Sequence, residues 1–299
     1  MRVVVAGGTG FLGRALAPAL LGKGHEVVVV TRDPARASLL AGARAASWAD
    51  LPRVVDGAGA VVNLAGETIS RRWTASAKER IVASRVEAAA RVGEALRAAS
   101  ARPVVLLNAS AVGLYGDRGD EELSESSGAG SGFLAETVVE WESAARRAAP
   151  EGVRLVLPRI GIVLGEEGGA LAKMLPPFRL GLGGPLGSGR QWMPWIHRDD
   201  LVSLVTTALE DPRFEGPVNA VAPAPVTMRE FAATLGRVLR RPAVAPAPAF
   251  AIRAALGEMS GLVLEGQRAL PAKALSLGFR FRFERLEPAL RDLLAPARG

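Results

Sequence analysis

Residues 7–13 read GGTGFLG and directly follow the apolar run 3–6. The pattern predicts a buried strand, a glycine turn and the first turn of a helix. Glycine adopts positive φ freely and lets the backbone approach a ligand more closely than a Cβ would permit. The free N–H groups and positive dipole end of the helix would attract phosphate, so we expect this loop to bind a dinucleotide through its diphosphate. The expected contact residues are Gly7, Gly8, Thr9, Gly10, Phe11, Leu12 and Gly13.

The second strand of the pattern, expected over 27–31, ends in Thr31-Arg32. An NAD-specific protein usually ends this strand with Asp or Glu, which would repel the 2′-phosphate of NADP. A threonine hydroxyl and an arginine guanidinium can instead bind that phosphate. Asp33 is followed by Pro34, which is typical of a helix N-cap rather than a ribose ligand. The sequence therefore favours NADP, with NAD as the alternative.

The elements that must position this loop alternate between apolar strands and alanine-rich helices. Strands are expected at 3–6, 27–31, 60–64, 103–108 and 153–157. Strand–helix alternation predicts an α/β fold, a doubly wound parallel Rossmann sheet, because parallel strands require crossover connections. Ligands of such sheets bind at the carboxyl ends of the strands.

After Gly161 the composition shifts to glycine- and proline-rich stretches. We interpret residues 1–160 as the cofactor-binding domain and 161–299 as a second, smaller C-terminal domain. Segment 196–222 is expected to return to the main sheet as a helix and a strand. Helices of the second domain are expected near 227–240, 248–257 and 285–294.

The composition restricts the class of protein. With 49% hydrophobic and 22% charged residues, the 299-residue chain can bury a large core. It contains no cysteine, which excludes disulfides and thiolate metal sites, and we predict no metal centre. The first strand begins at residue 2 and no apolar run approaches the roughly 18 residues that span a bilayer. A soluble, cytoplasmic protein without membrane contact is therefore expected.

The net charge of +7 raises the question of whether the protein binds nucleic acid. The arginines of the chain are scattered in pairs, as at Arg71-Arg72 and Arg146-Arg147. They are not interleaved with aromatic residues, and the sequence has no helix-turn-helix pattern. Nucleic-acid binding is not favoured, and an anionic cofactor accounts for part of the charge.

Longer motifs point to a family. They are VVNLAGE at 61–67, RRWT at 71–74, SAVGLYG at 110–116, GGPLGSGRQWMPWIH at 183–197 and VLEGQ at 263–267. With the glycine loop they resemble the extended branch of the short-chain dehydrogenase/reductase superfamily. More closely, the chain resembles an atypical subgroup of nucleoside-diphosphate-sugar epimerases with a small C-terminal domain. The resemblance implies that Gly7, Gly10 and Gly13 lie under the pyrophosphate and that Asn63-Leu64-Ala65-Gly66 lines the cofactor.

Catalytic members of that superfamily use a tyrosine, a lysine four residues later and a Ser or Thr hydroxyl. The cation keeps the pKa of the tyrosine low enough for proton transfer. This chain has one tyrosine, Tyr115, and Gly119 stands four residues beyond it. The helix expected over 131–149 has Phe133 or Leu134 at the tyrosine position and Thr137 or Val138 at the lysine position. The hydroxyl position falls on Ala111, with Ser110 one residue earlier.

Another group must then handle the proton if the protein is an enzyme. The candidates are Tyr115, Glu67, His197 and Ser110. Tyr115 could instead pack over the sheet edge, Glu67 could order the following loop, and His197 could cap the next helix.

Further contacts are expected around the cofactor. The resemblance and the geometry of the helix over 76–99 bring Glu79 and Arg85 beside it, unless they form a solvated face. Arg159 and Val163 are expected to border the nicotinamide. A mostly apolar pocket between the domains could be walled by Trp73, Met174, Trp192 and Trp195, although core packing explains each equally well.

Two functions remain open. The first is an NADP(H)-dependent oxidoreductase or epimerase-like isomerase acting on a small substrate in the cleft. The second is a non-catalytic NADP(H)-binding sensor or regulatory protein, in which the cofactor stabilises a conformation recognised by a partner.

Overall fold

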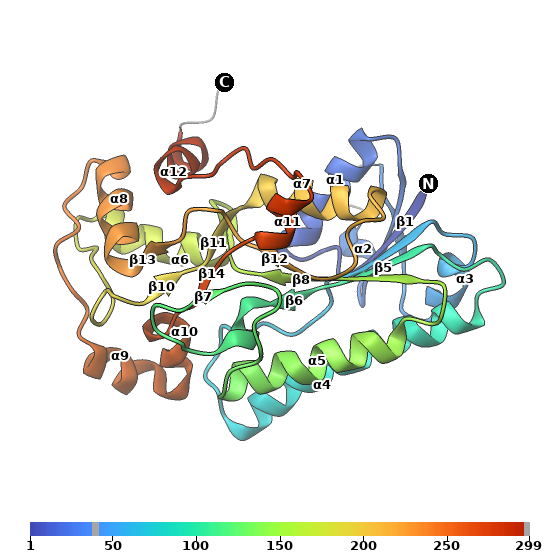
Figure 1. Ribbon diagram of the computed structural model, residues 1–299, viewed down its shortest axis with the longest axis horizontal. Coiled ribbons are helices and arrows are strands. Elements are labelled where there is room, and N and C mark those ends of the chain that lie inside the picture. Colours follow the sequence, from blue (N-terminus) through green and yellow to red (C-terminus); the bar gives the residue numbers. More distant parts are fainter. Residues whose placement is uncertain (38–41, 296–299) are drawn as a thin grey trace.

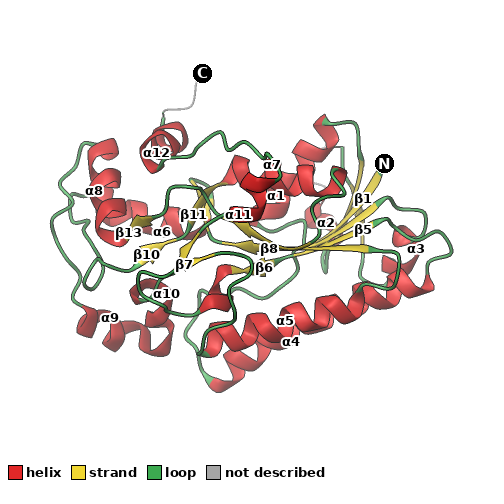
Figure 2. Cartoon of the chain, in the orientation of Figure 1, coloured by secondary structure: helices red, strands yellow, loops and turns green. Residues whose placement is uncertain are grey.

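The computed structural model describes residues 1–37 and 42–295. A central sheet carries helices on both faces, and a smaller, mainly helical unit lies at one end (Figures 1 and 2). The elements are β1 (Arg2–Ala6), α1 (Phe11–Gly22), β2 (Glu26–Val30), α2 (Pro34–Ala37), β3 (Arg44–Ala46), α3 (Leu51–Val55), β4 (Ala60–Asn63), α4 (Ala75–Ala98), β5 (Val105–Asn108), β6 (Ser110–Ala111), the 3₁₀ helix η1 (Val112–Tyr115), β7 (Glu122–Leu123), α5 (Phe133–Ala148), β8 (Arg154–Ile160), β9 (Ile162–Gly165), α6 (Gly169–Arg179), β10 (Trp192–Met193), β11 (Trp195–His197), α7 (Arg198–Glu210), β12 (Gly216–Ala220), β13 (Val226–Thr227), α8 (Met228–Leu239), α9 (Ala249–Leu256), η2 (Gly257–Ser260), α10 (Gly261–Leu264), β14 (Arg268–Ala269), α11 (Ala272–Ser276) and α12 (Leu286–Leu294).

The main sheet runs β3-β2-β1-β4-β5-β8-β12, with β6 added beside β8. Every pairing in it is parallel. The chain moves outward from β1 to β3 and then crosses back to β4 on the other side of β1. This reversal makes the carboxyl ends of β1 and β4 the switch point of the sheet, which is where doubly wound sheets bind their ligands. The predicted Rossmann fold is confirmed.

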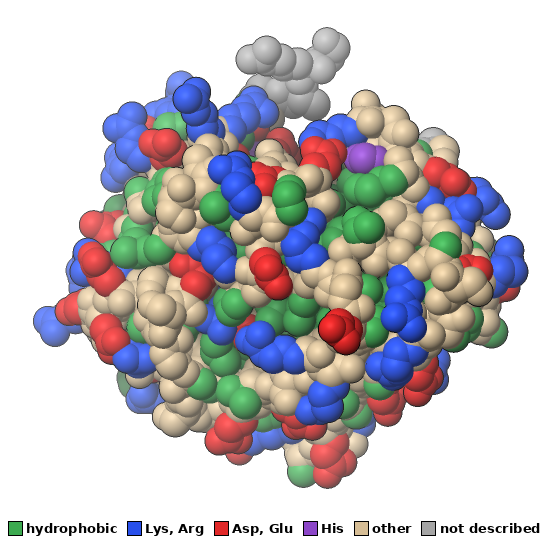
Figure 3. Space-filling view, turned by 45° about the vertical axis from the view of Figure 1, so that its right-hand side comes forward, with side chains coloured by type: hydrophobic (Ala, Val, Ile, Leu, Met, Phe, Trp, Pro, Cys, Tyr) green, Lys and Arg blue, Asp and Glu red, His purple; other side chains and the backbone are tan. Residues whose placement is uncertain are grey.

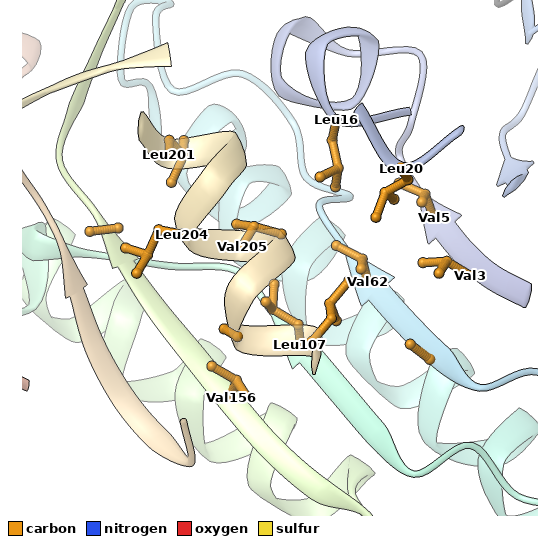
Figure 4. Close-up of a cluster of buried hydrophobic side chains, with 14 of the residues drawn as sticks. Val3, Val5, Leu16, Leu20, Val62, Leu107, Val156, Leu201, Leu204 and Val205 are labelled. Atoms are coloured by element: carbon orange, nitrogen blue, oxygen red, sulfur yellow. The ribbon is translucent and has the colours of Figure 1, made fainter. Parts of the chain in front are cut away.

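Both faces of the sheet are buried, which is why the strands are continuous apolar runs rather than alternating ones. Val3 and Val5 face α1 and α7, whereas Val4 packs on the opposite side against α3 and α4. Figure 4 shows the first layer, in which Leu16 of α1 and Leu204 of α7 approach the strands. Burying each such side chain contributes about 1.5–3 kcal/mol.

The two edge strands of the sheet differ in length and in sequence pattern. β12 pairs with β8 from Gly216 to Ala220, so the chain returns to the sheet after α7. At the other edge, β3 is only Arg44–Ala46. Its sequence RAA lacks an apolar run, and hydrophobic patterning therefore missed it.

The smaller unit has its own core, formed by α6, α8 and α12 with the short strands around them. Helix α8 begins with the capping box of Thr227 and Glu230, in which each side chain bonds the other residue's backbone N–H. β9 follows β8 of the main sheet in the chain and pairs in parallel with β11 as a separate two-stranded sheet. The Phe11 ring of α1 packs against Gly165 and Gly168 next to this pair.

On the face shown in Figure 3, basic and acidic side chains are interspersed. Among the helices formed by residues 1–37 and 42–295, none is long and apolar enough to cross a bilayer.

Candidate functional site

Three strand ends lie side by side at the switch point of the sheet. Gly7 follows β1, Thr31 follows β2 and the segment Leu64–Gly66 follows β4. The Gly7 N–H donates to Val30 O at 3.0 Å, and the Leu64 N–H donates to Ala6 O at 2.9 Å. These bonds extend the ladder by one residue and hold the three loops side by side.

Gly7 and Gly13 of the turn answer different spatial demands. Gly7 has φ +76°, and a Cβ on it would lie 2.8 Å from the Ala65 nitrogen. A Cβ on Gly13 would lie 2.3 Å from Gly8 Cα, so α1 can start this close to the turn only without a side chain. Positive φ is required at Gly7 alone, whereas the sequence argument extended that reason to the whole loop.

Gly10 is the glycine that the fold itself does not need. A Cβ there would meet only Gly7 O, at 3.4 Å. Gly10 is also the N-cap of α1, and no side chain caps the helix. The first-turn N–H groups of Phe11, Leu12 and Gly13 have no acceptor within the helix, because an α-helix leaves these donors free. The turn therefore presents bare backbone and N–H donors to an anion.

Three further residues of this loop, Thr9, Phe11 and Leu12, are held by contacts within the protein. The Thr9 carbonyl accepts from Arg14 Nε at 3.0 Å. The Phe11 ring packs beside Gly165 and Gly168, where a Cβ would come within 2.7 Å of it. Leu12 packs against the sheet core.

The end of β2 presents Thr31 and Arg32 beside the turn. Thr31 is buried, and its Oγ1 accepts from the Asp33 N–H at 3.3 Å. Arg32 is exposed, and Asp33 directly precedes α2. The position that carries an acid in NAD-specific proteins thus carries a hydroxyl and a cation.

The Asn63 side chain is not exposed; it positions the loop after β4 from the protein interior. It is fully buried, and its Nδ2 donates to Asn108 Oδ1 at 2.7 Å. Its Oδ1 accepts from the Ala65 N–H at 3.2 Å. This pairing of two strand ends holds Ala65 and Gly66 in place beside Gly7.

A cavity of about 540 Å³ opens beyond β6 and β8, between α5 and the smaller unit. Its wall is mainly apolar and aromatic, and includes Trp73, Met174 and Trp192. Trp195, expected in the same wall, is buried in the core of the smaller unit and donates to Ala224 O. Sequence reasoning missed Trp141, which faces the cavity one helical turn after Thr137.

The positions that the superfamily uses for catalysis face this cavity. Phe133, Leu134, Thr137 and Val138 of α5 all line it, and so does Ala111. The Thr137 hydroxyl donates to Phe133 O at 2.6 Å, within its own helix. The place of the catalytic tyrosine and lysine is therefore an apolar wall.

Arg85 is the cation of this wall. Its Nη1 donates to Ile81 O at 2.8 Å, and its guanidinium carbon lies 5.1 Å from the centre of the Trp141 ring. Burial lowers the pKa of Arg85 to about 10, because removal from water disfavours the charged form.

Ser110, Tyr115 and Arg159 belong to a buried network rather than to the cavity. Arg159 forms a bidentate ion pair with Glu142, with Nε–Oε1 2.8 Å and Nη2–Oε2 3.2 Å. Ser110 Oγ donates to Glu142 Oε1 at 2.7 Å. Tyr115 Oη donates to Asn219 Oδ1 at 2.6 Å and accepts from Arg159 Nη1 at 3.0 Å.

This network joins β6, η1, α5, β8 and β12. Burial raises the pKa of the Tyr115 hydroxyl, which opposes its ionisation near neutrality. Arg159 lies within β8 rather than after it, and its guanidinium points into the network instead of bordering a nicotinamide. Sequence reasoning missed Glu142 and Asn219, because the network forms only when distant strands pair.

The remaining candidates also lie outside the cavity wall. Glu67 forms an ion pair with Arg71, and its backbone N–H donates to Ser84 Oγ at 2.9 Å. Glu79 lines an outer groove between α4 and α5. Val163 of β9 packs against the sheet core, although its neighbours Gly161 and Ile162 line the cavity.

His197 is completely buried at the start of α7. Its Nδ1 accepts from the Asp199 N–H at 3.0 Å and caps that helix, while its ring stacks on Phe283 at 4.0 Å. Burial lowers the pKa of His197, and the carboxylates of Asp199, Asp200 and Asp292 oppose this shift only in part. The geometry is that of a structural cap.

The model of the NAD dependent epimerase/dehydratase family matches residues 3–221. The chain belongs to this family. A domain of unknown function (DUF1731) matches residues 247–293, within the smaller unit.

Relatives match this family member over nearly its whole length. The chloroplastic homolog of epimerase family protein SDR39U1 from Arabidopsis thaliana is 44% identical over 98% of this chain and 87% of the relative. The Homo sapiens protein SDR39U1 is 40% identical over 99% of this chain and 100% of the relative. A crystal structure of human SDR39U1 with NADPH has a TM-score of 0.91 at 39% identity, and covers 98% of this chain and 99% of that one.

Proposed function

We propose that this family member binds NADP(H) across the carboxyl ends of β1, β2 and β4. The observation that carries the proposal is the open turn at Gly10, which lies beside an uncapped helix end and a β2 end with Arg32 in place of an acid. The diphosphate would accept hydrogen bonds from the first-turn N–H groups of α1, and the 2′-phosphate would bind Thr31 and Arg32. The NADPH in the human relative's structure supports this assignment.

We further propose an oxidoreductase that acts on a small molecule in the 540 Å³ cavity. Bound NADP(H) would supply or accept the hydride, and this chain would hold the cofactor beside the mainly apolar cavity. Tyr115, Ser110 and His197 are bonded elsewhere, and Glu67 is paired with Arg71, so we assign these four candidates to structure. The proton would then move through the substrate or water.

Epimerisation of a nucleotide sugar is less well supported. It needs a base to remove a hydroxyl proton, and the wall offers Phe133 and Leu134 where that base belongs. The same observation favours a second candidate function, an NADP(H) sensor without turnover. The cytoplasmic location expected from the sequence stays a prediction.

Titration of the purified protein with NADPH and NADH tests cofactor choice, and absorbance at 340 nm over a panel of carbonyl compounds tests turnover. Wild type should bind NADPH more tightly than NADH. Arg32→Asp should weaken NADPH about 10- to 100-fold, the value of a charged hydrogen bond, and NADH by less than about threefold. Arg253→Asp on exposed α9 carries the same charge change and should alter neither affinity.

Two results would contradict these proposals. Equal losses of NADPH and NADH in Arg32→Asp would remove the phosphate contact. Tight NADPH binding without consumption over the whole panel would favour the sensor.

A further inference from the structure

The charged residues in the wall of the 540 Å³ cavity are unevenly divided between cofactor and substrate. Within the described ranges 1–37 and 42–295 they are Arg85, Glu258 and Glu265. A Cβ on Gly66 would lie 3.2 Å from Arg85 Cζ, and Gly66 belongs to the loop that borders Gly7. Under the proposed function the cofactor crosses these strand ends, so Arg85 belongs to the cofactor contacts that the sequence predicts.

The two remaining charged residues of the described wall are both acidic. Glu258 forms an ion pair with Lys78, and Glu265 is exposed at the end of α10. A ligand with a carboxylate or a phosphate would lose part of its hydration here and would approach charges of its own sign. Once Arg85 is paired with the cofactor, this part of the cavity therefore disfavours an anion.

Polar side chains of the wall are bonded within the protein. Gln191 Nε2 donates to two backbone carbonyls, at 3.0 and 2.7 Å, and Gln267 Nε2 donates to a third at 3.0 Å. Trp192 Nε1 donates to Asp120 Oδ1 at 2.8 Å. Hydroxyl groups of a sugar need partners on several sides, and unmade hydrogen bonds of a buried polar group are costly. The wall therefore suits a ligand with few polar groups.

Aromatic rings reach the cavity from three separate segments. They are Trp73 before α4, Phe133 at the start of α5 and Trp192 in β10. The Trp73 and Phe133 rings meet edge to face, with centroids 4.9 Å apart. An aromatic ligand would extend this cluster through further edge-to-face or offset-stacked contacts.

Cations of the protein already face two of these rings. Lys78 Nζ lies 5.2 Å from the centre of the Phe133 ring, and Arg268 Cζ lies 4.8 Å from the centre of the Trp192 ring. A cationic ligand stacked on either ring would approach a charge of its own sign, which opposes its cation–π attraction. Neither sign of charge therefore suits the ligand.

We propose that this cavity binds an uncharged molecule with an aromatic body. This substrate class rests on the proposed function, because it describes the molecule that would lie beside the cofactor. It also separates the chain from a use of nucleotide sugars, whose diphosphate would need a cation that the described wall does not offer beyond Arg85.

Three probes with one ring system test the class: 2-naphthamide, which is uncharged, 2-naphthoate, which is an anion, and 2-naphthylmethylammonium, which is a cation. Each is titrated by calorimetry into wild-type protein saturated with NADPH. We expect 2-naphthamide to bind at least about tenfold more tightly than either charged probe, because an unpaired charge is costly to desolvate. Equal or tighter binding of a charged probe would overturn the proposal, and this comparison needs no variant.

Two variants test the wall itself. Glu265→Arg should strengthen binding of 2-naphthoate about threefold or more and leave 2-naphthamide within twofold. Glu94→Arg makes the same charge change at an exposed position of α4 outside the wall and should alter neither affinity. Trp73→Leu should weaken 2-naphthamide about 3- to 10-fold, the value of an aromatic contact, whereas Trp48→Leu, which lies outside the wall, should not. An unchanged affinity in Trp73→Leu would also contradict the proposal.

Arg85→Gln separates this inference from the proposed function. It removes the cation of the wall, so the preference for 2-naphthamide should appear in this variant without any cofactor. Its absence there would overturn the substrate class. If wild type fails to bind NADPH while Arg85→Gln shows the preference, only the proposed function is refuted.

Discussion

Alanine at Gly10 and at Gly13 should separate cofactor binding from folding within one turn. A Cβ on Gly13 would lie 2.3 Å from Gly8 Cα and 2.4 Å from Gly8 O, both of them backbone atoms. Neither can move without shifting β1 or α1. We therefore expect Gly13→Ala to cost about 3 kcal/mol, the upper range for overpacking. At roughly 2 °C per kcal/mol for a chain of this size, the melting temperature should fall by about 6 °C.

Gly10→Ala should behave in the opposite way. Its Cβ would meet only Gly7 O at 3.4 Å, so the fold loses little more than the N-cap preference for glycine, about 0.5–1 kcal/mol. The melting temperature of the free protein should fall by no more than about 2 °C. The added methyl group would occupy the space over which the diphosphate must approach. Loss of one charged hydrogen bond there should raise the NADPH dissociation constant about 10- to 100-fold.

Differential scanning calorimetry without cofactor and NADPH fluorescence titration at 20 °C measure the two effects. Gly22→Ala is the control, because a Cβ at that exposed helix end meets nothing within 4 Å. The reasoning fails if Gly10→Ala binds NADPH as tightly as wild type, since the diphosphate would then not lie over this turn.

Two further predictions concern residues that we assign to structure. Tyr115→Phe should cost about 1–3 kcal/mol by calorimetry, because Arg159 and Asn219 lose a buried partner, while the NADPH affinity stays within twofold; a large loss of turnover with unchanged stability would restore Tyr115 as a proton donor. Burial lowers the pKa of His197 below its ordinary value of 6.5, so the unfolded chain takes up this proton first and stability falls as the pH drops below about 6.5. His197→Asn keeps a capping acceptor and should flatten the pH dependence of the melting temperature between pH 5 and 7; an unchanged slope would exclude His197 as its source.

The sequence alone specified the parts of this protein that depend on local pattern. The valine runs of β1 and β2 and the glycine spacing of 7–13 predicted the sheet and its first crossover, because burial on both faces and positive φ constrain residue type locally. The prediction that Thr31 and Arg32 bind a phosphate likewise used only the residues at the end of one strand. Strand β3 was missed because its three residues carry no apolar signal.

Only the tertiary structure decided what the polar residues do. Ser110, Tyr115 and Arg159 lie near strand ends in the sequence, yet side-chain direction turns all three into the ion-pair network around Glu142. Arg85 is one helical charge among many until Gly66 and Trp141 enclose it. Such contacts join segments tens of residues apart, and local pattern carries no information about them. The strand order that brings α4, α5 and the loop after β4 together determines which charges remain available to a ligand.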